Sequence, residues 1–216
     1  MAAPPLRMSS TKSFPPEAFR RHAFVRLDRA AADVSDEQEV REWIAGGGPF
    51  VVRRPCRSAA GVFLGLSLPP SSQERRFALE MSGDFVTDVF DPPLWSACPT
   101  LERSELAALD AAAEACGSAL RSFGSHAWQH LTGLAYVAPT SDIDLLIDVA
   151  DAACWDVLRR ELPAELPPGI DLEIVLKRDA AFSWREFCDP NPGLLFKGNS
   201  DVWMGSKSDV HDRLSR

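Results

Sequence analysis

The sequence predicts an α/β protein of the α+β kind, in which a smaller α+β domain precedes a second domain built on a mixed sheet with helices. Short apolar segments alternate with helical patterns along the chain, and the segment Asp91-Pro92-Pro93 separates two such regions. In the second region, residues 141–149 read as a buried strand, and a helix and another strand follow. We therefore expect four parts: a flexible tail at 1–16, an N-terminal domain at 17–95, a C-terminal domain at 96–205 and a flexible tail at 206–216.

The N-terminal domain is expected to contain a small sheet and one helix. Residues 22–28 form a short apolar segment, and 50–54 and 61–68 read as the two strands of a hairpin. Ser35 is a good helix N-cap with Gln38 three residues later, and the following glycines end the helix.

The C-terminal domain begins with the strongest helical pattern, at 100–120. A strand then runs into the turn Gly124-Ser125, and Trp128, Trp155 and Trp184 are expected in the core. The remaining elements are listed in chain order: a helix at 126–132, a strand at 141–149, a helix at 150–162, a strand at 170–176, a helix at 182–187 and a strand at 194–198.

Composition excludes several classes of protein. The formal net charge of −8 disfavours binding to nucleic acid or to an anionic membrane surface, and no apolar run is long enough to span a bilayer. The five cysteines are scattered and form no Cys-x-x-Cys pair, which argues against structural zinc and a disulfide framework. We expect a cytoplasmic protein with reduced cysteines.

Two carboxylates open the strand at 141–149. Asp142 and Asp144 project from the same side because side chains alternate along a strand. Paired carboxylates repel each other unless a cation bridges them or one is protonated, and Mg²⁺ favours such oxygens. A solvated acidic strand start is the alternative interpretation.

Further candidate residues lie on either side of this pair. On the next strand, Asp171 and Glu173 share one face, so either could supply a third carboxylate. The turn Gly124-Ser125, at a helix start, could present N–H groups and a hydroxyl to a phosphate. Arginine suits bidentate phosphate contact, although ordinary surface ion pairs would also explain four arginines of the N-terminal domain: Arg53, Arg54, Arg75 and Arg76.

In combination, these signals resemble the nucleotidyltransferase superfamily, and most closely the malonate decarboxylase holo-acyl-carrier-protein synthases, also called phosphoribosyl-dephospho-CoA transferases. Sixteen residues separate Gly124-Ser125 from Asp142, a gap similar to that of this family. The motifs that carry the resemblance are Trp128-Gln129, Leu131-Thr132-Gly133-Leu134, Ser141-Asp142-Ile143-Asp144-Leu145-Leu146, Asp171-Leu172-Glu173 and Trp184-Arg185-Glu186. Weaker similarities are Arg21-His22, Pro49-Phe50-Val51-Val52-Arg53-Arg54, Gln73-Glu74-Arg75-Arg76 and Leu195-Phe196-Lys197.

The resemblance implies a nucleotidyltransferase-like fold for the C-terminal domain, and a specific reaction. The donor would be 2′-(5″-triphosphoribosyl)-3′-dephospho-CoA, and the acceptor a serine hydroxyl on the acyl-carrier subunit of malonate decarboxylase. Attack at the α-phosphate would release diphosphate.

The resemblance also implies roles for individual residues. Asp142 and Asp144 would bind two Mg²⁺ ions, with Mn²⁺ as an alternative metal. Asp171 would hold the metal on the nucleophile side, with Glu173 as its rival, and Asp171 or Asp144 could take the serine proton. Gly124 and Ser125 would hold the β- and γ-phosphates. Candidates for contacts with the triphosphate and the carrier are Arg53, Arg54, Arg75, Arg76 and Lys197, whereas His22 is expected to be structural.

Two other functions fit the acidic motif. One is a divergent nucleotidyltransferase that uses an ordinary nucleoside triphosphate on a small molecule or protein hydroxyl. The other is a non-catalytic binding module that kept the fold.

Overall fold

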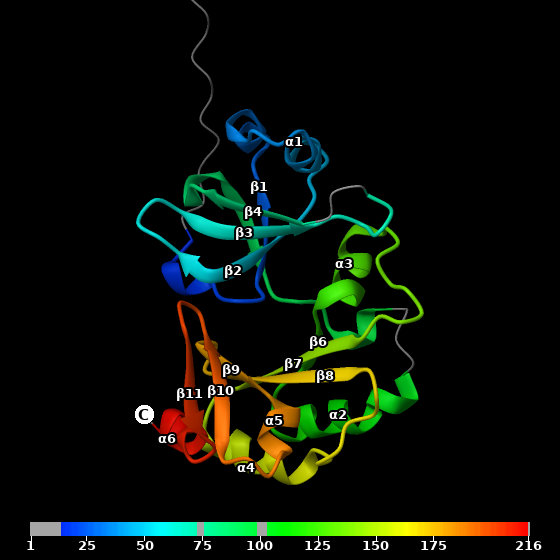
Figure 1. The fold of residues 1–216 in the computed structure, drawn as a ribbon, viewed down its shortest axis with the longest axis vertical. Helices are drawn as coiled ribbons and strands as arrows, with labels where there is room; N and C mark the ends of the chain where they lie inside the picture. Colours follow the sequence, from blue (N-terminus) through cyan, green and yellow to red (C-terminus); the bar gives the residue numbers. More distant parts are fainter. Residues whose placement is uncertain (1–13, 73–75, 99–102, 216) are drawn as a thin grey trace, which may run out of the picture.

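Two β-sheets lie one above the other in the computed structural model, which describes residues 14–72, 76–98 and 103–215 (Figure 1). The upper sheet comes from the N-terminal half of the chain and the lower one from the C-terminal half. This arrangement confirms the predicted α+β fold with two parts. Residues 1–13 of the expected N-terminal tail, Arg75, and the expected helix start at 100–102 lie outside the described residues.

The N-terminal sheet is antiparallel, with strand order β4-β3-β2-β1-β5. Helix α1 (Gln38–Ala45) packs above it, and begins after Glu37 rather than at Ser35. The strands are β1 (Phe24–Leu27), β2 (Phe50–Arg57), β3 (Val62–Ser67), β4 (Arg76–Met81) and β5 (Val86–Phe90). Short 3-10 helices occur at Pro16–Ala18, Arg29–Val34, Gly83–Phe85 and Trp95–Ala97.

The C-terminal sheet is mixed, with strand order β11-β10-β9-β8-β7-β6. Only the β7–β8 pair is parallel among the described strands, and helix α4 connects these two strands. The strands are β6 (Leu120–Ser122), β7 (Ile143–Val149), β8 (Ile170–Leu176), β9 (Ala180–Ser183), β10 (Gly193–Gly198) and β11 (Val202–Ser206). The helices are α2 (Arg103–Ala115), α3 (Gly124–Thr132), α4 (Ala152–Glu161), α5 (Trp184–Cys188) and α6 (Asp209–Ser215).

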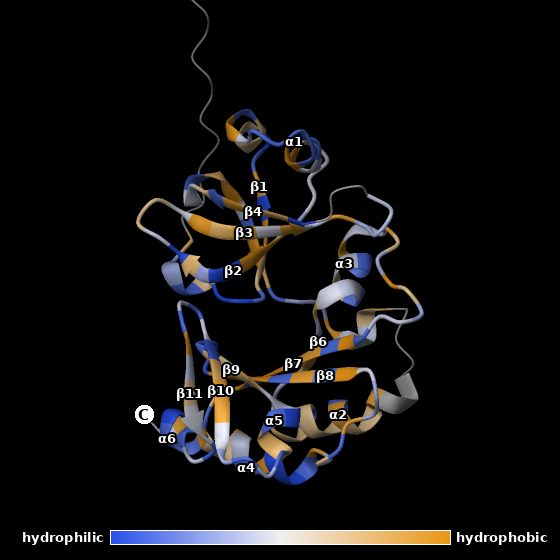
Figure 2. Cartoon of the chain, viewed as in Figure 1, coloured by the Kyte–Doolittle hydropathy of each residue, from blue (hydrophilic) through white to orange (hydrophobic). Residues whose placement is uncertain are grey.

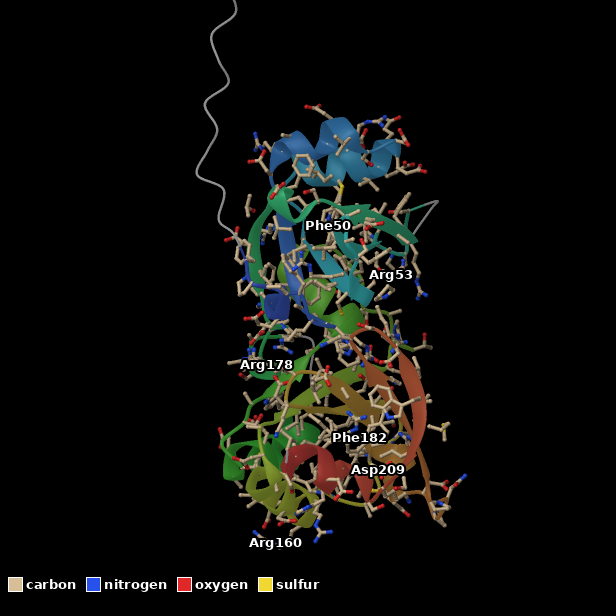
Figure 3. The ribbon with its side chains drawn as sticks, turned by 90° about the vertical axis from the view of Figure 1, so that its left-hand side faces the viewer. Phe50, Arg53, Arg160, Arg178, Phe182 and Asp209 are labelled. Atoms are coloured by element: carbon tan, nitrogen blue, oxygen red, sulfur yellow. The ribbon has the colours of Figure 1, made fainter. Side chains whose placement is uncertain are left out.

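The two faces of the C-terminal sheet have different covers. Helices α2, α4, α5 and α6 lie below it, where Trp155 and Trp184 join the buried core as predicted (Figure 1). The N-terminal half lies above it. Figure 2 shows hydrophobic residues along β3, β8 and β10, as expected for strands that bury a face. Fully buried phenylalanines, Phe50 above and Phe182 below, mark the two interiors in Figure 3.

Helix α3 follows β6 of the lower sheet but packs into the core of the upper half. Its Ala127 and Trp128 are buried among residues of the N-terminal sheet, and Tyr136 of the following loop joins them. The Trp128 ring meets Phe24 edge-on at 5.5 Å and stacks on Tyr136 at 5.8 Å between centroids. The start of α3 is therefore fixed relative to both sheets.

The C-terminal end of the chain corrects the expectation of a flexible tail at 206–216. Residues 209–215 form helix α6, with Val210 and Leu214 buried. The guanidinium of Arg213 lies 4.3 Å from the centroid of the Trp203 ring, a favourable cation–π geometry. Two apolar residues one turn apart are too short a pattern to predict a helix, and packing rather than propensity stabilises this one.

The short helix predicted at 182–187 is also different in the structure. Residues 180–183 instead form β9, which pairs with β8, and the helix α5 covers only Trp184–Cys188. Within the described residues, no helix is both long and apolar enough to cross a membrane.

We predict that Leu214→Ala destabilises the protein by about 2–3 kcal/mol, because it leaves a cavity under α6. Asp212→Ala, on the exposed side of the same helix, should change stability by less than about 0.5 kcal/mol. Chemical denaturation measures both values. Equal, small effects would mean that α6 does not pack on the sheet.

Candidate active site

The predicted acids meet at the start of two neighbouring parallel strands. Asp144 on β7 is in register with Asp171 on β8. Asp142 immediately precedes β7. Gly169 lies just before β8, and a Cβ placed on it would lie 3.8 Å from Oδ1 of Asp142. Asp142 and Asp171 are exposed, whereas Asp144 is half-buried. The connection through α4 brings the strand starts together because parallel strands need a crossover.

The Gly124-Ser125 turn lies directly against Asp144. The backbone N–H of Phe123 donates to the Asp144 carbonyl at 3.0 Å. Gly124 has φ +60°, and a Cβ there would lie 1.9 Å from Asp144 Oδ2. Only glycine fits this contact, which brings the N-terminus of α3 to the acids.

The start of α3 has no side-chain cap. Phe123 occupies the N-cap position, where its ring offers no oxygen to the first N–H groups of the helix. The positive end of the nine-residue helix thus faces the carboxylates. An anion bound here would be stabilised by the helix and by the N–H groups of its first turn.

The acids shift the protonation of Asp144. Burial, followed by the charges of Asp171, Asp142 and Glu173, raises the pKa of Asp144 to about 6. A cavity of about 350 Å³ opens beside the other two acids and is lined by Asp142, Gly169, Ile170, Asp171 and Arg185. The site therefore combines repelling carboxylates with an open space and one arginine.

Glu173, the rival third carboxylate, has a different environment. It is in register with Leu146 and is only 3% exposed. Arg21 donates to both carboxylate oxygens, at 2.9 and 2.7 Å, and Lys197 Nζ lies 2.6 Å from Oε1. Burial favours the protonated acid, but the His22 hydrogen bond and the charges of Arg21, His22 and Lys197 outweigh it, so the pKa of Glu173 is lowered. The geometry favours Asp171 as the third acid of the site.

His22 also contacts the residue before the Gly-Ser turn. Its Nε2 lies 3.0 Å from Glu173 Oε2, and its ring lies 4.6 Å from the ring of Phe123. Burial lowers the pKa of His22. The His22 imidazole thus links the Glu173 carboxylate to the residue that precedes the Gly-Ser turn.

The predicted basic residues are dispersed. Arg53 is exposed on β2 of the upper sheet (Figure 3), and Arg76 is exposed on the edge strand β4. Arg54 is half-buried and points to the other side of β2, with Nη1 buried and without a hydrogen-bond partner. Lys197 is on the same face as the acids but is bonded to Glu173.

The acids of the site have the chemistry of metal ligands but not a preformed ligand geometry. In the part of the chain that the structure describes, no group of three or more His, Cys, Asp or Glu side chains converges tightly enough to hold a metal. The chemistry of the donors nevertheless fits a hard divalent cation, since Asp142, Asp144 and Asp171 repel one another and present only oxygens. Metal binding here would require small side-chain movements.

Sequence reasoning missed Arg185 at the acid cavity and the ion pairs that connect the two halves. Arg185 was noted only as part of a motif, yet it lines the acid cavity and donates to the Ile170 carbonyl at 3.1 Å. The linker residue Asp91 lies 2.6 Å from Arg20, 3.7 Å from Arg121 and 3.6 Å from Arg178. Figure 3 shows Arg178 at the level where the halves meet. Sequence patterns could not reveal these contacts, because the residues that form them are distant in sequence.

Comparison with known proteins identifies the family. A model described as the phosphoribosyl-dephospho-CoA transferase MdcG C-terminal domain matches residues 93–208, and the corresponding N-terminal domain model matches residues 20–92. The chain belongs to the phosphoribosyl-dephospho-CoA transferase family. The resemblance stated from the motifs is thus confirmed, and the family is one of transferase enzymes.

Curated members of this family are similar over most of their length. A phosphoribosyl-dephospho-CoA transferase of Xanthomonas euvesicatoria is 34% identical over 194 residues, covering 84% of this chain and 91% of the relative. One from Xanthomonas axonopodis is 37% identical over 195 residues, with the same two coverages. One from Bradyrhizobium diazoefficiens is 34% identical over 181 residues, or 78% of each chain. No solved structure gives a significant match.

We predict that Gly124→Ala is more damaging than Gly133→Ala. Both glycines have positive φ, +60° and +71°, so both variants should lose about 1 kcal/mol of stability from backbone strain. Nothing lies within 4 Å of a Cβ at Gly133, whereas a Cβ at Gly124 would displace Asp144. Thermal unfolding should show a further loss of about 1–3 kcal/mol for Gly124→Ala. Equal losses would contradict the close contact with Asp144.

We predict that Asp144→Asn stabilises the metal-free protein at neutral pH. The folded state holds the Asp144 proton up to about pH 6, whereas the carboxyl loses it near its ordinary value of 3.8 when unfolded. Wild-type stability therefore falls as pH rises through this interval, and the variant lacks this loss. With solvent screening included, the gain should be about 1–2 kcal/mol above pH 6.

Denaturation in EDTA between pH 4 and 7.5 measures this difference. The gain should shrink towards zero at pH 4, and Asp156→Asn, at an exposed position of α4, should show no such trend. A gain independent of pH would show that the Asp144 carboxyl is not perturbed.

Proposed function

We propose that this protein transfers the phosphoribosyl-dephospho-CoA group from 2′-(5″-triphosphoribosyl)-3′-dephospho-CoA to a serine hydroxyl on the acyl-carrier subunit of malonate decarboxylase. The observation that carries the proposal is the contact of the uncapped α3 N-terminus, at Gly124, with Asp144 beside Asp171. Family membership supports the phosphoribosyl-dephospho-CoA group as the cargo.

The start of α3 would hold the triphosphate. The backbone N–H groups of its first turn and the Ser125 hydroxyl would bind the β- and γ-phosphates. Arg185, at the edge of the acid cavity, is placed to contact a phosphate oxygen or the acceptor protein. These groups would position the α-phosphorus at the mouth of the cavity.

The acids would carry the transfer itself. The serine oxygen forms a bond to the α-phosphorus, the bond from that phosphorus to the bridging oxygen of the β-phosphate breaks, and diphosphate leaves. Asp171 is exposed and beside the cavity, so it could accept the serine proton. Asp142, Asp144 and Asp171 would hold Mg²⁺, which when bound supplies neutralisation of phosphate charge.

The reaction can be tested with purified components. The protein, the triphosphoribosyl donor, Mg²⁺ and apo-carrier should yield a carrier whose intact mass is increased by the prosthetic group. We predict that Asp144→Asn lowers the rate by at least about 100-fold, whereas Asp156→Asn retains it.

Two results would overturn the proposal. An unchanged carrier mass with a donor that a known family member accepts would exclude this reaction. Diphosphate release from ATP or CTP instead would favour a nucleotidyltransferase that uses ordinary nucleoside triphosphates.

A further inference from the structure

A second cavity, of about 550 Å³, lies away from the acids, between the N-terminal half and the far end of α3. This volume is within the range of small-molecule sites. Its apolar lining comes mainly from Trp43, Leu68, Leu131 and Leu134, all half-buried or exposed. Leu134 is 42% exposed and adds to the accessible apolar surface of the cavity.

The described polar lining of this cavity includes the C-terminal ends of two helices and two carboxylates. Helix α1 ends at the cavity with Gly46, Gly47 and Gly48, and α3 ends there with Thr132. The negative ends of two helix dipoles therefore point towards it. Glu39 and Glu42 add two carboxylates.

Among the described residues that line the cavity, one is a cation, and it is already engaged. Arg26 Nη1 donates to the Gly47 carbonyl. A phosphate would meet two helix C-termini and two carboxylates, and the described lining offers it no uncommitted cation. The cavity thus suits an uncharged ligand that is partly apolar and rich in N–H and O–H donors.

Helix α3 connects this cavity to the phosphate end of the site. Its nine residues, Gly124–Thr132, span about 13 Å. A ligand that occupies both ends must carry its uncharged part well away from its triphosphate. In the donor of the proposed function, adenine follows directly after the two sugars, whereas pantetheine lies further out, beyond a diphosphate.

We propose that this cavity binds the pantetheine arm of the dephospho-CoA donor. This inference rests on the proposed function. The arm is uncharged and has a branched aliphatic segment, two amide N–H groups, a hydroxyl and a thiol. Its apolar segment matches Trp43, Leu68, Leu131 and Leu134, and its donors match the carboxylates of Glu39 and Glu42 and the negative helix ends. Adenine, with a single amino group as donor, matches this acceptor-rich lining less well.

Filling the cavity without disturbing the core gives a clean test. Leu134→Trp places a larger side chain at an exposed lining position, and Val34→Trp makes a similar change at a residue that is 59% exposed and does not line the cavity. Isothermal titration calorimetry on the full-length protein would compare dephospho-CoA with AMP, which lacks the pantetheine arm. Thermal unfolding would verify that both variants remain folded.

We expect Leu134→Trp to weaken dephospho-CoA binding by about tenfold or more, and AMP binding by less than about twofold. Val34→Trp should bind both like the wild type. Unchanged dephospho-CoA binding in Leu134→Trp would overturn the inference and leave the proposed function standing. Equal weakening of AMP would assign the cavity to the adenosine end and also overturn it. A wild-type protein that does not bind dephospho-CoA would overturn the proposed donor, and the inference with it.

Discussion

The rest of the structure depends on one buried carboxylate, that of Glu173. It lies in the middle of the C-terminal sheet, where an unpaired charge would be very costly. Arg21 and Lys197 neutralise it and His22 completes its hydrogen bonds. Because Arg21 and His22 come from the N-terminal half, satisfying this one charge fixes that half over the sheet. Glu173 is buried beneath the N-terminal half, whereas Asp171, at the start of the same strand, is exposed.

Charged groups add to the apolar packing of α3 at the interface between the two halves. Asp91, in the linker, forms ion pairs with Arg20 of the N-terminal half and with Arg121 and Arg178 of the C-terminal half. These pairs tie the linker to both halves. The β10–β11 turn adds backbone contacts, since Asn199 accepts from the N–H groups of Arg21 and Cys56. Such contacts are directional, and they set an orientation more sharply than an apolar surface of the same size.

The sequence predicted what local rules decide. Alternation along strands placed Asp142 and Asp144 on one face, and Asp171 and Glu173 on one face of the following strand; the structure puts Asp171 in register with Asp144. Alternation could not decide whether Asp171 or Glu173 is the third acid, because both side chains leave β8 on the same side. The residue that distinguishes them is Arg21, which binds Glu173 and is 152 residues away in the sequence. The same limit applies to α6, which is stable only through packing. It applies also to the positions of Arg53 and Arg76, whose strands lie in the other sheet. Long-range contacts, not local propensity, decided each of these cases.

Helix α3 has a consequence for how the chain folds. The boundary between the two family models falls at residues 92 and 93, but Trp128 and Tyr136, from the second, are buried in the core of the first. A fragment made only of residues 20–92 would lack these aromatic rings, and one of residues 93–208 would expose them to water. Two sequence modules are thus one cooperative unit, and either half made alone is expected to aggregate rather than to fold. A different N-terminal module could replace the present one only if its core also accommodated Trp128 and Tyr136.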